Sequence, residues 1–485
     1  MLEKGIAKYR SLPIQTRAAF WFLICSFMQR GISTITTPIF THLLSTAEYG
    51  RYQVFNSWLG IVSIFVSMNL FSGVYAQGVV KFDKERPVFS SSLQGLTLTL
   101  ASAWTVIYVV FHSFWNSLFD LTTVQMLAML LMTWTSAVFN FWATEQRVTF
   151  SYKKLVAITI LVSIAKPAVG IFFVINAEDK VTARILGLAL VELIAYFALF
   201  VVQIRRGKKF FHAGFWRYAI LFNLPLIPHY LSQTVLNSAD RIMIKDMIGE
   251  AESGIYSLAY SISMIMTLFN TALSQTISPW IYQKIKDKRI GDISQIAYAT
   301  LALIAVVNIL LIAFAPEVVS IFAPESYYDA IWIMPPVAMS VYFMFAYDLF
   351  AKFEFYFEKT KFIMAASIVA AILNIILNYI FIKIFGYYAA GYTTLFCYII
   401  YTVGHYCFMR RVCRRYLDGQ DPYRLKILLP ITAVFLLVGF VFLFVYQHMV
   451  IRYVMVAVII VGCVLFRKKI MEVVRLIRAG SKKKA

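Results

Sequence analysis

The chain has 485 residues, of which 60% are hydrophobic and only 14% are charged. Soluble domains carry about 25% charged residues, so this composition excludes an ordinary soluble enzyme or binding domain. A formal net charge of +21 would suit a protein that binds nucleic acid. In a chain this apolar, however, the basic residues are better interpreted by the side of the membrane on which they lie, because that side indicates the topology.

Long apolar segments follow one another from the N-terminus to the C-terminus. Windows of 18 or more residues without charge are typical of transmembrane helices. The first apolar run, of about 23 residues, is too long for the core of a signal peptide, and we expect it to remain as the first span. We predict an all-α polytopic membrane protein with about 14 transmembrane helices, at 18–40, 52–78, 89–111, 122–144, 154–176, 182–203, 218–238, 254–281, 294–315, 329–351, 362–384, 387–409, 427–446 and 450–466.

Lysine and arginine residues are distributed unevenly between the two predicted sides. If both termini are cytoplasmic, 36 of the 45 basic residues fall inside, seven fall outside, and Arg30 and Lys166 lie within spans. Cytoplasmic segments of membrane proteins carry an excess of Lys and Arg. The distribution therefore predicts an even number of spans with both termini inside, and it accounts for the net charge without a nucleic-acid partner.

An internal repeat relates the two halves of the chain. Shifted by 204 residues without a gap, 29–65 matches 233–269 at eight of 37 positions, and both segments contain the pattern AExGxY. The repeat pairs span 1 with span 7 and span 2 with span 8, so it is parallel, as in some transporters. We read the glycine as a turn residue and the glutamate as a cap of the next helix.

The repeat predicts the organisation of the chain. An N-terminal lobe covers 1–209 with spans 1–6, and a C-terminal lobe covers 210–415 with spans 7–12. Spans 13 and 14 at 416–466 are an addition to these two six-helix lobes. The basic tail at 467–485 alternates apolar and basic residues at helical spacing, so we expect it on the anionic inner surface of the membrane.

Three segments together carry a resemblance to a known family: HLLSTAEYGRYQVF at 42–55, DRIMIKDMIGEAESGIYSLAYS at 240–261, and KTKFIMAASIVAAILNIILNYIFIKIFGYYAAGYTT at 359–394. In their order and spacing they resemble the Wzx-type O-antigen and capsule flippases of the multidrug/oligosaccharidyl-lipid/polysaccharide exporter superfamily. The resemblance implies two lobes in a V around a central cavity. It also implies a multi-pass protein of the bacterial cytoplasmic (inner) membrane that is not an enzyme.

The same resemblance implies a substrate and partners. The substrate would be an oligosaccharide linked through pyrophosphate to undecaprenol. It would move from the cytoplasmic to the outer leaflet by alternating access, for the synthesis of lipopolysaccharide O-antigen, capsule or exopolysaccharide. Membrane lipids, a polysaccharide polymerase and a chain-length regulator are the other partners to expect. No cofactor is expected, and transport could be coupled to a gradient of Na⁺ or H⁺.

Arg30 lies deep in the first predicted span. It is about 13 residues, or roughly 20 Å, from the inner end of that span, in a hydrocarbon core about 30 Å thick. A charge at this depth is costly, and it usually faces a cavity or a partner. One alternative is a cationic cavity, since arginine binds phosphate oxygens in a bidentate manner. The other is an ion pair with Glu192 of span 6 that only holds helices together.

Further polar residues extend the predicted cavity, because amides suit hydroxyl-rich sugars. For Arg241, a solvated loop is an equal alternative. For His229, beside Pro228, a packing role is the alternative, and the commoner one for such a residue. Glu192 and Asp348 could carry a coupling ion. The alternative for each is an ion pair, which for Asp348 would be with Lys352 or Lys359. No catalytic or metal-binding residue is expected. The predicted substrate-binding residues are Arg30, Lys166, Arg241, Gln29, Gln233, Asn237, Asn270 and His229.

Other functions remain open at this point. A peptidoglycan-precursor flippase would also need a cationic cavity, whereas a multidrug antiporter for cations would need an acidic one. A polytopic glycan polymerase or ligase usually carries a large outside loop, and the predicted outside loops are short. The sequence contains neither GxxxxGK[ST] nor HExxH, which argues against a P-loop ATPase and a zinc protease.

Overall fold

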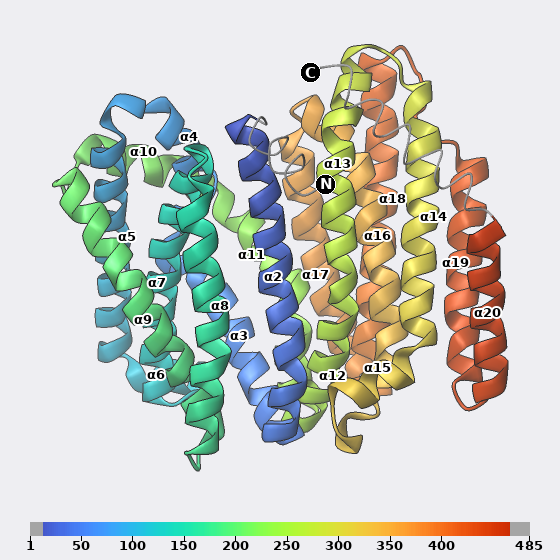
Figure 1. Ribbon diagram of the computed structural model, residues 1–485, viewed down its shortest axis with the longest axis horizontal. Coiled ribbons are helices and arrows are strands. Elements are labelled where there is room, and N and C mark those ends of the chain that lie inside the picture. The colour runs from blue at the N-terminus through green and yellow to red at the C-terminus, as the bar shows by residue number, and fades with distance from the viewer. Residues whose placement is uncertain (1–12, 466–485) are drawn as a thin grey trace, which may run out of the picture. The chain divides into compact units, whose positions relative to one another are not determined.

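The computed structural model describes residues 13–465, and every regular element within them is helical (Figure 1). The basic tail at 467–485 lies outside the described residues. Within them, nine helices are long and apolar enough to cross a membrane, and one or two helices lie at each of the fourteen predicted spans. The prediction of an all-helical polytopic membrane protein is therefore confirmed.

The chain divides into two compact units between Ser238 and Ala239. This boundary lies inside a helix, whereas the predicted lobes meet at residue 209, and the bounds of those lobes stay a prediction. The first unit contains α2 (Ile14–Leu43), α3 (Thr46–Ser67), α4 (Val74–Lys81), α5 (Arg86–Val110), α6 (His112–Phe119), α7 (Thr123–Val148), α8 (Tyr152–Ile175), α9 (Lys180–Gly207), α10 (Ala213–Asn223) and the first half of α11 (Ile227–Met247).

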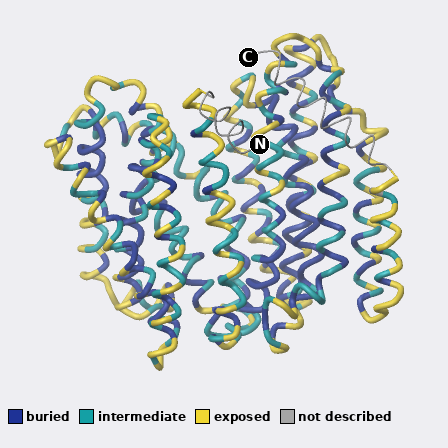
Figure 2. The backbone as a smooth tube through the Cα atoms, in the orientation of Figure 1, coloured by how far each residue is buried: buried dark blue, intermediate teal, exposed yellow. Residues whose placement is uncertain are grey.

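Helix α7 is the centre of the first unit. Most of its apolar window is buried, and it packs against α5 and α9, while α8 packs against α9 and α2 against α8. Dark blue tube segments in Figure 2 show the burial of this interior. Close backbone packing holds α5 near the end of α9, because a Cβ on Gly95 would lie 2.1 Å from the Phe210 carbonyl oxygen.

The predicted second span is two helices, α3 and α4, rather than one. Met68 and Asn69 adopt positive φ angles of 49° and 48°, which end α3, because a left-handed residue cannot continue a right-handed helix. The side-chain nitrogen of Asn223 donates to the carbonyls of both residues at 2.8 Å. The break is thus held in place by a residue 154 and 155 positions away from the two carbonyls, which local sequence patterns do not reveal.

The second unit contains the rest of α11 and then α12 (Glu250–Ser263), α13 (Thr267–Lys286), α14 (Gly291–Ala313), α15 (Ala315–Phe322), α16 (Ala330–Tyr356), α17 (Thr360–Phe385), α18 (Ala389–Tyr416), α19 (Leu425–Val445) and α20 (Met449–Leu465). Helix α16 is its centre, and it packs against α12, α13, α14, α18 and α19. The predicted seventh and eighth spans are again interrupted, the seventh by a 3-10 turn at Leu224–Leu226 that contains Pro225. Proline lacks the amide hydrogen that a continuous helix needs.

The repeated AExGxY pattern lies at the start of α3 and of α12. Gly50 and Gly254 are buried inside these helices, so the prediction that they form a turn was wrong. The predicted cap is confirmed at Glu48, whose carboxylate accepts from the Ser45 amide at 2.8 Å while the Ser45 side chain accepts from the Glu48 amide. This reciprocal capping box satisfies two otherwise unpaired amides.

Candidate functional site

Helices α2 and α8 lie side by side and run in the same direction. The ring of Trp21 stacks on Tyr152 near their N-terminal ends, and Phe40 lies against Gly170 near their C-terminal ends. This register places Lys166 about 8 Å further along the pair than Arg30, at 1.5 Å per residue. Two of the predicted cavity cations therefore lie on neighbouring helices within two turns of each other.

Arg30 and Gln29 are exposed on α2 although they lie in the middle of its apolar length. The hydroxyls near them hydrogen-bond within the helix, since Ser26 donates to the Phe22 carbonyl and Thr37 to the Ser33 carbonyl, each at 3.0 Å. Because these hydroxyls donate their hydrogens within α2, they need no acceptor on a neighbouring helix, and their oxygens can still accept a hydrogen bond. Ser26, Arg30, Ser33 and Thr37 therefore form a polar stripe along α2, and Phe27 and Met28 beside it are exposed as well.

Glu192 on α9 is paired with Lys166 on α8. The ammonium nitrogen lies 2.5 Å from one carboxylate oxygen, and the other oxygen accepts from Thr135 at 2.8 Å and from Ser136 at 3.3 Å. The Glu192 side chain is 3% exposed, while that of Lys166 is 29% exposed. The structure thus pairs Glu192 with Lys166, whereas the sequence offered Arg30 as the partner of Glu192 in one of its two alternatives.

This pair bears on the predicted role of Lys166 as well. An ammonium that neutralises a buried carboxylate has part of its charge already compensated, so it is a weaker anion site than an uncompensated one. Its partial exposure still leaves one side of the group accessible. Pro167 follows directly and removes one backbone hydrogen bond from α8.

The second unit contains a buried carboxylate, Asp240 on α11, which is 1% exposed. One oxygen accepts from Tyr256 of α12 at 2.5 Å and from Thr394 of α18 at 2.9 Å, and the other accepts from Asn378 of α17 at 2.5 Å. Four helices therefore converge on one intramembrane acid. Ionisable groups at membrane depth commonly mark pathways for ions or substrates.

Two amides complete the surroundings of Asp240. Asn374 and Asn378 are both fully buried on α17, one turn apart, and the side-chain oxygen of Asn378 also accepts from Thr393. Among the described residues, the side-chain nitrogen of Asn374 is buried without a hydrogen-bond partner. The side-chain oxygen of Asn374 accepts from the side-chain nitrogen of Asn378 at 3.3 Å, so it lies one residue away from the Asp240 carboxylate. Carboxylate, amide and hydroxyl oxygens are the ligands of hard cations.

The sequence prediction missed Asp240 because of a boundary error. It ended the seventh span at 238, which left Asp240 in a loop, whereas α11 continues to Met247. The signal that could have revealed it was its position, only two residues beyond the predicted end of a span. That span also contains Pro225 and Pro228, which make its ends hard to locate.

Other predicted residues make local contacts in the second unit. The guanidinium of Arg241 lies 4.3 Å from the ring centre of Tyr260, and Asn270 donates to the Val341 carbonyl at 2.9 Å. Asp348 accepts from Lys352 at 2.8 Å and from Ser274 at 2.6 Å. The Asp348–Lys352 ion pair that the sequence gave as an alternative is therefore present.

The remaining predicted residues lie on the first half of α11. The Asn237 amide nitrogen donates to the Gln233 carbonyl at 2.7 Å, and the His229 ring lies 6.0 Å from that of Tyr230. Gln233, Asn237 and His229 are each half-buried. Their role in substrate binding stays a prediction.

The helical fold, the repeat and the polar groups at membrane depth together define a polytopic membrane transporter. A family model described as "polysaccharide biosynthesis protein" matches residues 16–285, more than half of the chain, and a model described as "MatE" matches residues 225–380. The chain belongs to the polysaccharide biosynthesis protein family. It is a membrane transporter of the multidrug/oligosaccharidyl-lipid/polysaccharide exporter superfamily, as the resemblance implied.

The fold is also found in solved structures, and two curated proteins share part of the sequence. The fold is similar to "Lipid II flippase MurJ, inward closed conformation" with a TM-score of 0.69 at 15% identity, over 92% of this chain and 99% of that one. It is also similar to an inward-facing multidrug resistance MATE family transporter, with a TM-score of 0.60 at 12% identity, over 81% and 96%. "Lsg locus putative protein 1" of Haemophilus influenzae is 24% identical over 210 residues, 41% of this chain and 51% of the relative. The matches thus span about half the length of the curated relatives.

Proposed function

We propose that the protein moves an undecaprenyl-pyrophosphate-linked oligosaccharide from the cytoplasmic to the outer leaflet of the bacterial inner membrane, for the synthesis of O-antigen, capsule or another exopolysaccharide. Membership of the polysaccharide biosynthesis family supports this substrate class. A polysaccharide polymerase and a chain-length regulator are the partners that such a pathway supplies.

The observation that carries the proposal is the exposed guanidinium of Arg30 at the middle of α2. A pyrophosphate that crosses a low-dielectric slab loses its hydration, and a guanidinium offsets that loss with two parallel hydrogen bonds. Gln29 and the hydroxyls of the same face suit the sugar hydroxyls. A cation exporter would instead place uncompensated acids there.

The test is replacement of Arg30 in a cell that depends on this protein for surface polysaccharide. We expect Arg30→Ala to abolish the polysaccharide at an unchanged membrane level of the protein, and Arg30→Lys to retain part of it. Arg51→Ala, at the start of α3, is the matched control and should leave polysaccharide normal. Normal polysaccharide in Arg30→Ala cells contradicts the proposed binding role.

Two further assays distinguish the rival functions. Rescue of cells depleted of their lipid II flippase would assign the protein to peptidoglycan precursors. Export of organic cations, blocked by Asp240→Asn, would assign it to multidrug transport. Either result, with unchanged surface polysaccharide in a deletion strain, refutes the proposal.

We further propose that Asp240 holds the coupling cation, Na⁺ or H⁺. The carboxylate receives hydrogen bonds from α12, α17 and α18, so a cation that replaces those donors would change the packing of four helices together. Purified protein should be stabilised by NaCl relative to choline chloride if the ion is Na⁺, and Asp240→Asn should remove that difference. Asp246→Asn, on the exposed end of the same helix, should retain it. If neither salt nor Asp240→Asn alters transport, Asp240 is structural.

A further inference from the structure

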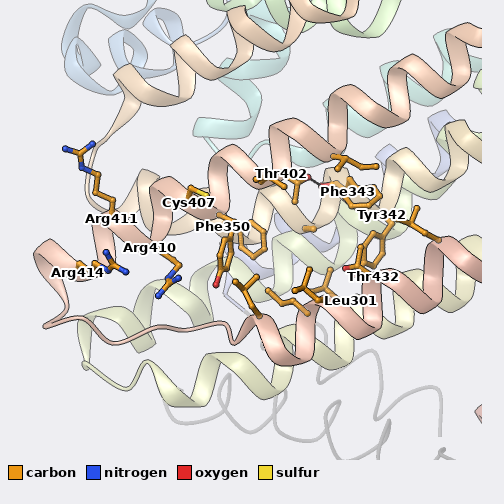
Figure 3. Close-up of a pocket in the computed structure, with 18 residues that line it drawn as sticks. Leu301, Tyr342, Phe343, Phe350, Thr402, Cys407, Arg410, Arg411, Arg414 and Thr432 are labelled. Carbon is orange, nitrogen blue, oxygen red and sulfur yellow. Dashed lines mark hydrogen bonds between the residues drawn. The ribbon is translucent and has the colours of Figure 1, made fainter. Parts of the chain in front are cut away.

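An apolar groove of about 760 Å³ lies within the second unit, between α14, α16, α18 and α19. Figure 3 shows aromatic and aliphatic side chains along most of its length, among them Tyr342 and Phe350. Three arginines, Arg410, Arg411 and Arg414, occupy one end. The groove therefore has one long apolar part and one short cationic part.

The apolar part has the depth of one membrane leaflet. Its lining on α19 extends from Leu425 to Leu436, about 16 Å at 1.5 Å per residue. Half of a hydrocarbon core about 30 Å thick is about 15 Å. The arginines lie at the C-terminal end of α18, beyond the predicted span end at 409, and so at the depth of lipid headgroups. The charge distribution predicts that this is the cytoplasmic leaflet.

Among the residues that the structure describes, the cationic end carries three arginines and one carboxylate that is paired with one of them. Arg410 is paired with Asp421, with a nitrogen–oxygen distance of 2.9 Å. Arg411 and Arg414 are exposed at the mouth, and the C-terminal dipole of α18 favours the positive charges that gather there. Asp421 is already paired with Arg410, so it is not available to bind the ammonium of a zwitterionic headgroup. The mouth therefore suits a lipid whose headgroup carries a phosphate and no ammonium.

We propose that this groove is a binding site for one anionic phospholipid of the leaflet that faces the C-terminal end of α18. Its acyl chains would lie between α16, α18 and α19, and its phosphate would contact Arg411 and Arg414. Basic pockets between transmembrane helices on the cytoplasmic side are known to suit such headgroups. An acyl chain is one leaflet long and fits the depth of the groove, whereas a long polyprenyl tail would extend beyond it.

The test is native mass spectrometry of the full-length protein in detergent, titrated separately with phosphatidylglycerol, phosphatidylcholine and undecaprenyl phosphate. We expect one phosphatidylglycerol to be retained in preference to phosphatidylcholine. The double substitution Arg411→Gln/Arg414→Gln should weaken its retention about 25-fold, at about fivefold for each arginine. Arg415→Gln is the matched control, since Arg415 is adjacent on α18 but does not line the groove, and it should retain the lipid.

A second variant tests the apolar part without altering the charges. Val403 is 53% exposed and lines the groove, so Val403→Trp should fill it, leave folding intact and displace the lipid. Equal retention by the wild type and by both variants overturns the proposal, as does equal affinity for phosphatidylcholine. Tighter binding of undecaprenyl phosphate that expels phosphatidylglycerol overturns it too, because the groove would then belong to the substrate tail.

Discussion

The Lys166–Glu192 pair permits a quantitative test of what holds the first unit together. Lys166→Met removes the ammonium from the Glu192 carboxylate, which is 3% exposed. Among the described residues, the hydroxyls of Thr135 and Ser136 remain as its donors. Breaking a buried pair on one side costs about 3–5 kcal/mol. Because Lys166 is itself 29% exposed and partly solvated, we expect the lower value, about 3 kcal/mol.

The double variant Lys166→Met/Glu192→Gln removes both charges and retains a side chain that can bond to Thr135. Replacing a whole buried pair is often neutral, so its free energy of unfolding should return to within about 1 kcal/mol of the wild type. Denaturant unfolding of the purified protein in mixed micelles measures both values. If Lys166→Met and the double variant unfold at the same denaturant concentration, the pair is not coupled and the reasoning is wrong. Loss of transport by a stable double variant would additionally support substrate contact by Lys166.

Two further substitutions test local features of the first unit by the same unfolding measurement. Ser45→Ala removes the capping box of α3 and should cost about 1 kcal/mol; an unchanged midpoint would contradict that role. Gly95→Ala places a Cβ 2.1 Å from a backbone oxygen of Phe210 and should cost about 1–3 kcal/mol, whereas the control Gly404→Ala has no atom within 4 Å and should be neutral or stabilising. Equal stability of the two glycine variants would refute the close approach of α5.

The sequence predicted the helices well because apolar length and charge asymmetry are local properties. It failed where a distant residue decides the outcome. The break after α3 depends on Asn223, and the partner of Glu192 depends on the packing of α8 against α9. Asp240 was missed for a related reason, since helix ends cannot be located to within a turn from composition. Its three hydrogen-bond donors come from segments that only the fold brings together.

The internal repeat shows which features the scaffold requires and which it does not. Arg30 in the first half corresponds to Thr234 in the second, and Asp240 in the second corresponds to Thr36 in the first. At each of these two positions, one half therefore carries a charge where the other carries a threonine. A parallel repeat supplies the same helix positions twice, and the two charges differ in sign. This division suits a transporter that binds an anionic substrate with one half and a cation with the other.

The repeated tyrosines of AExGxY provide a matched pair of variants for that division. Tyr52 contacts Arg184 through its ring face, with 3.6 Å between the guanidinium carbon and the ring centre, while Tyr256 donates its hydroxyl to Asp240 at 2.5 Å. Tyr52→Phe keeps the ring and should change unfolding by less than about 0.5 kcal/mol. Tyr256→Phe removes a hydrogen bond to a charged group and should cost about 1.5–3 kcal/mol. It should also alter the dependence of transport on the coupling cation, measured as the change in transport rate between NaCl and choline chloride or across a pH gradient. If the two variants behave alike in both measurements, the repeat-related tyrosines serve packing only, and the asymmetric roles of the two halves would have to rest on Arg30 alone.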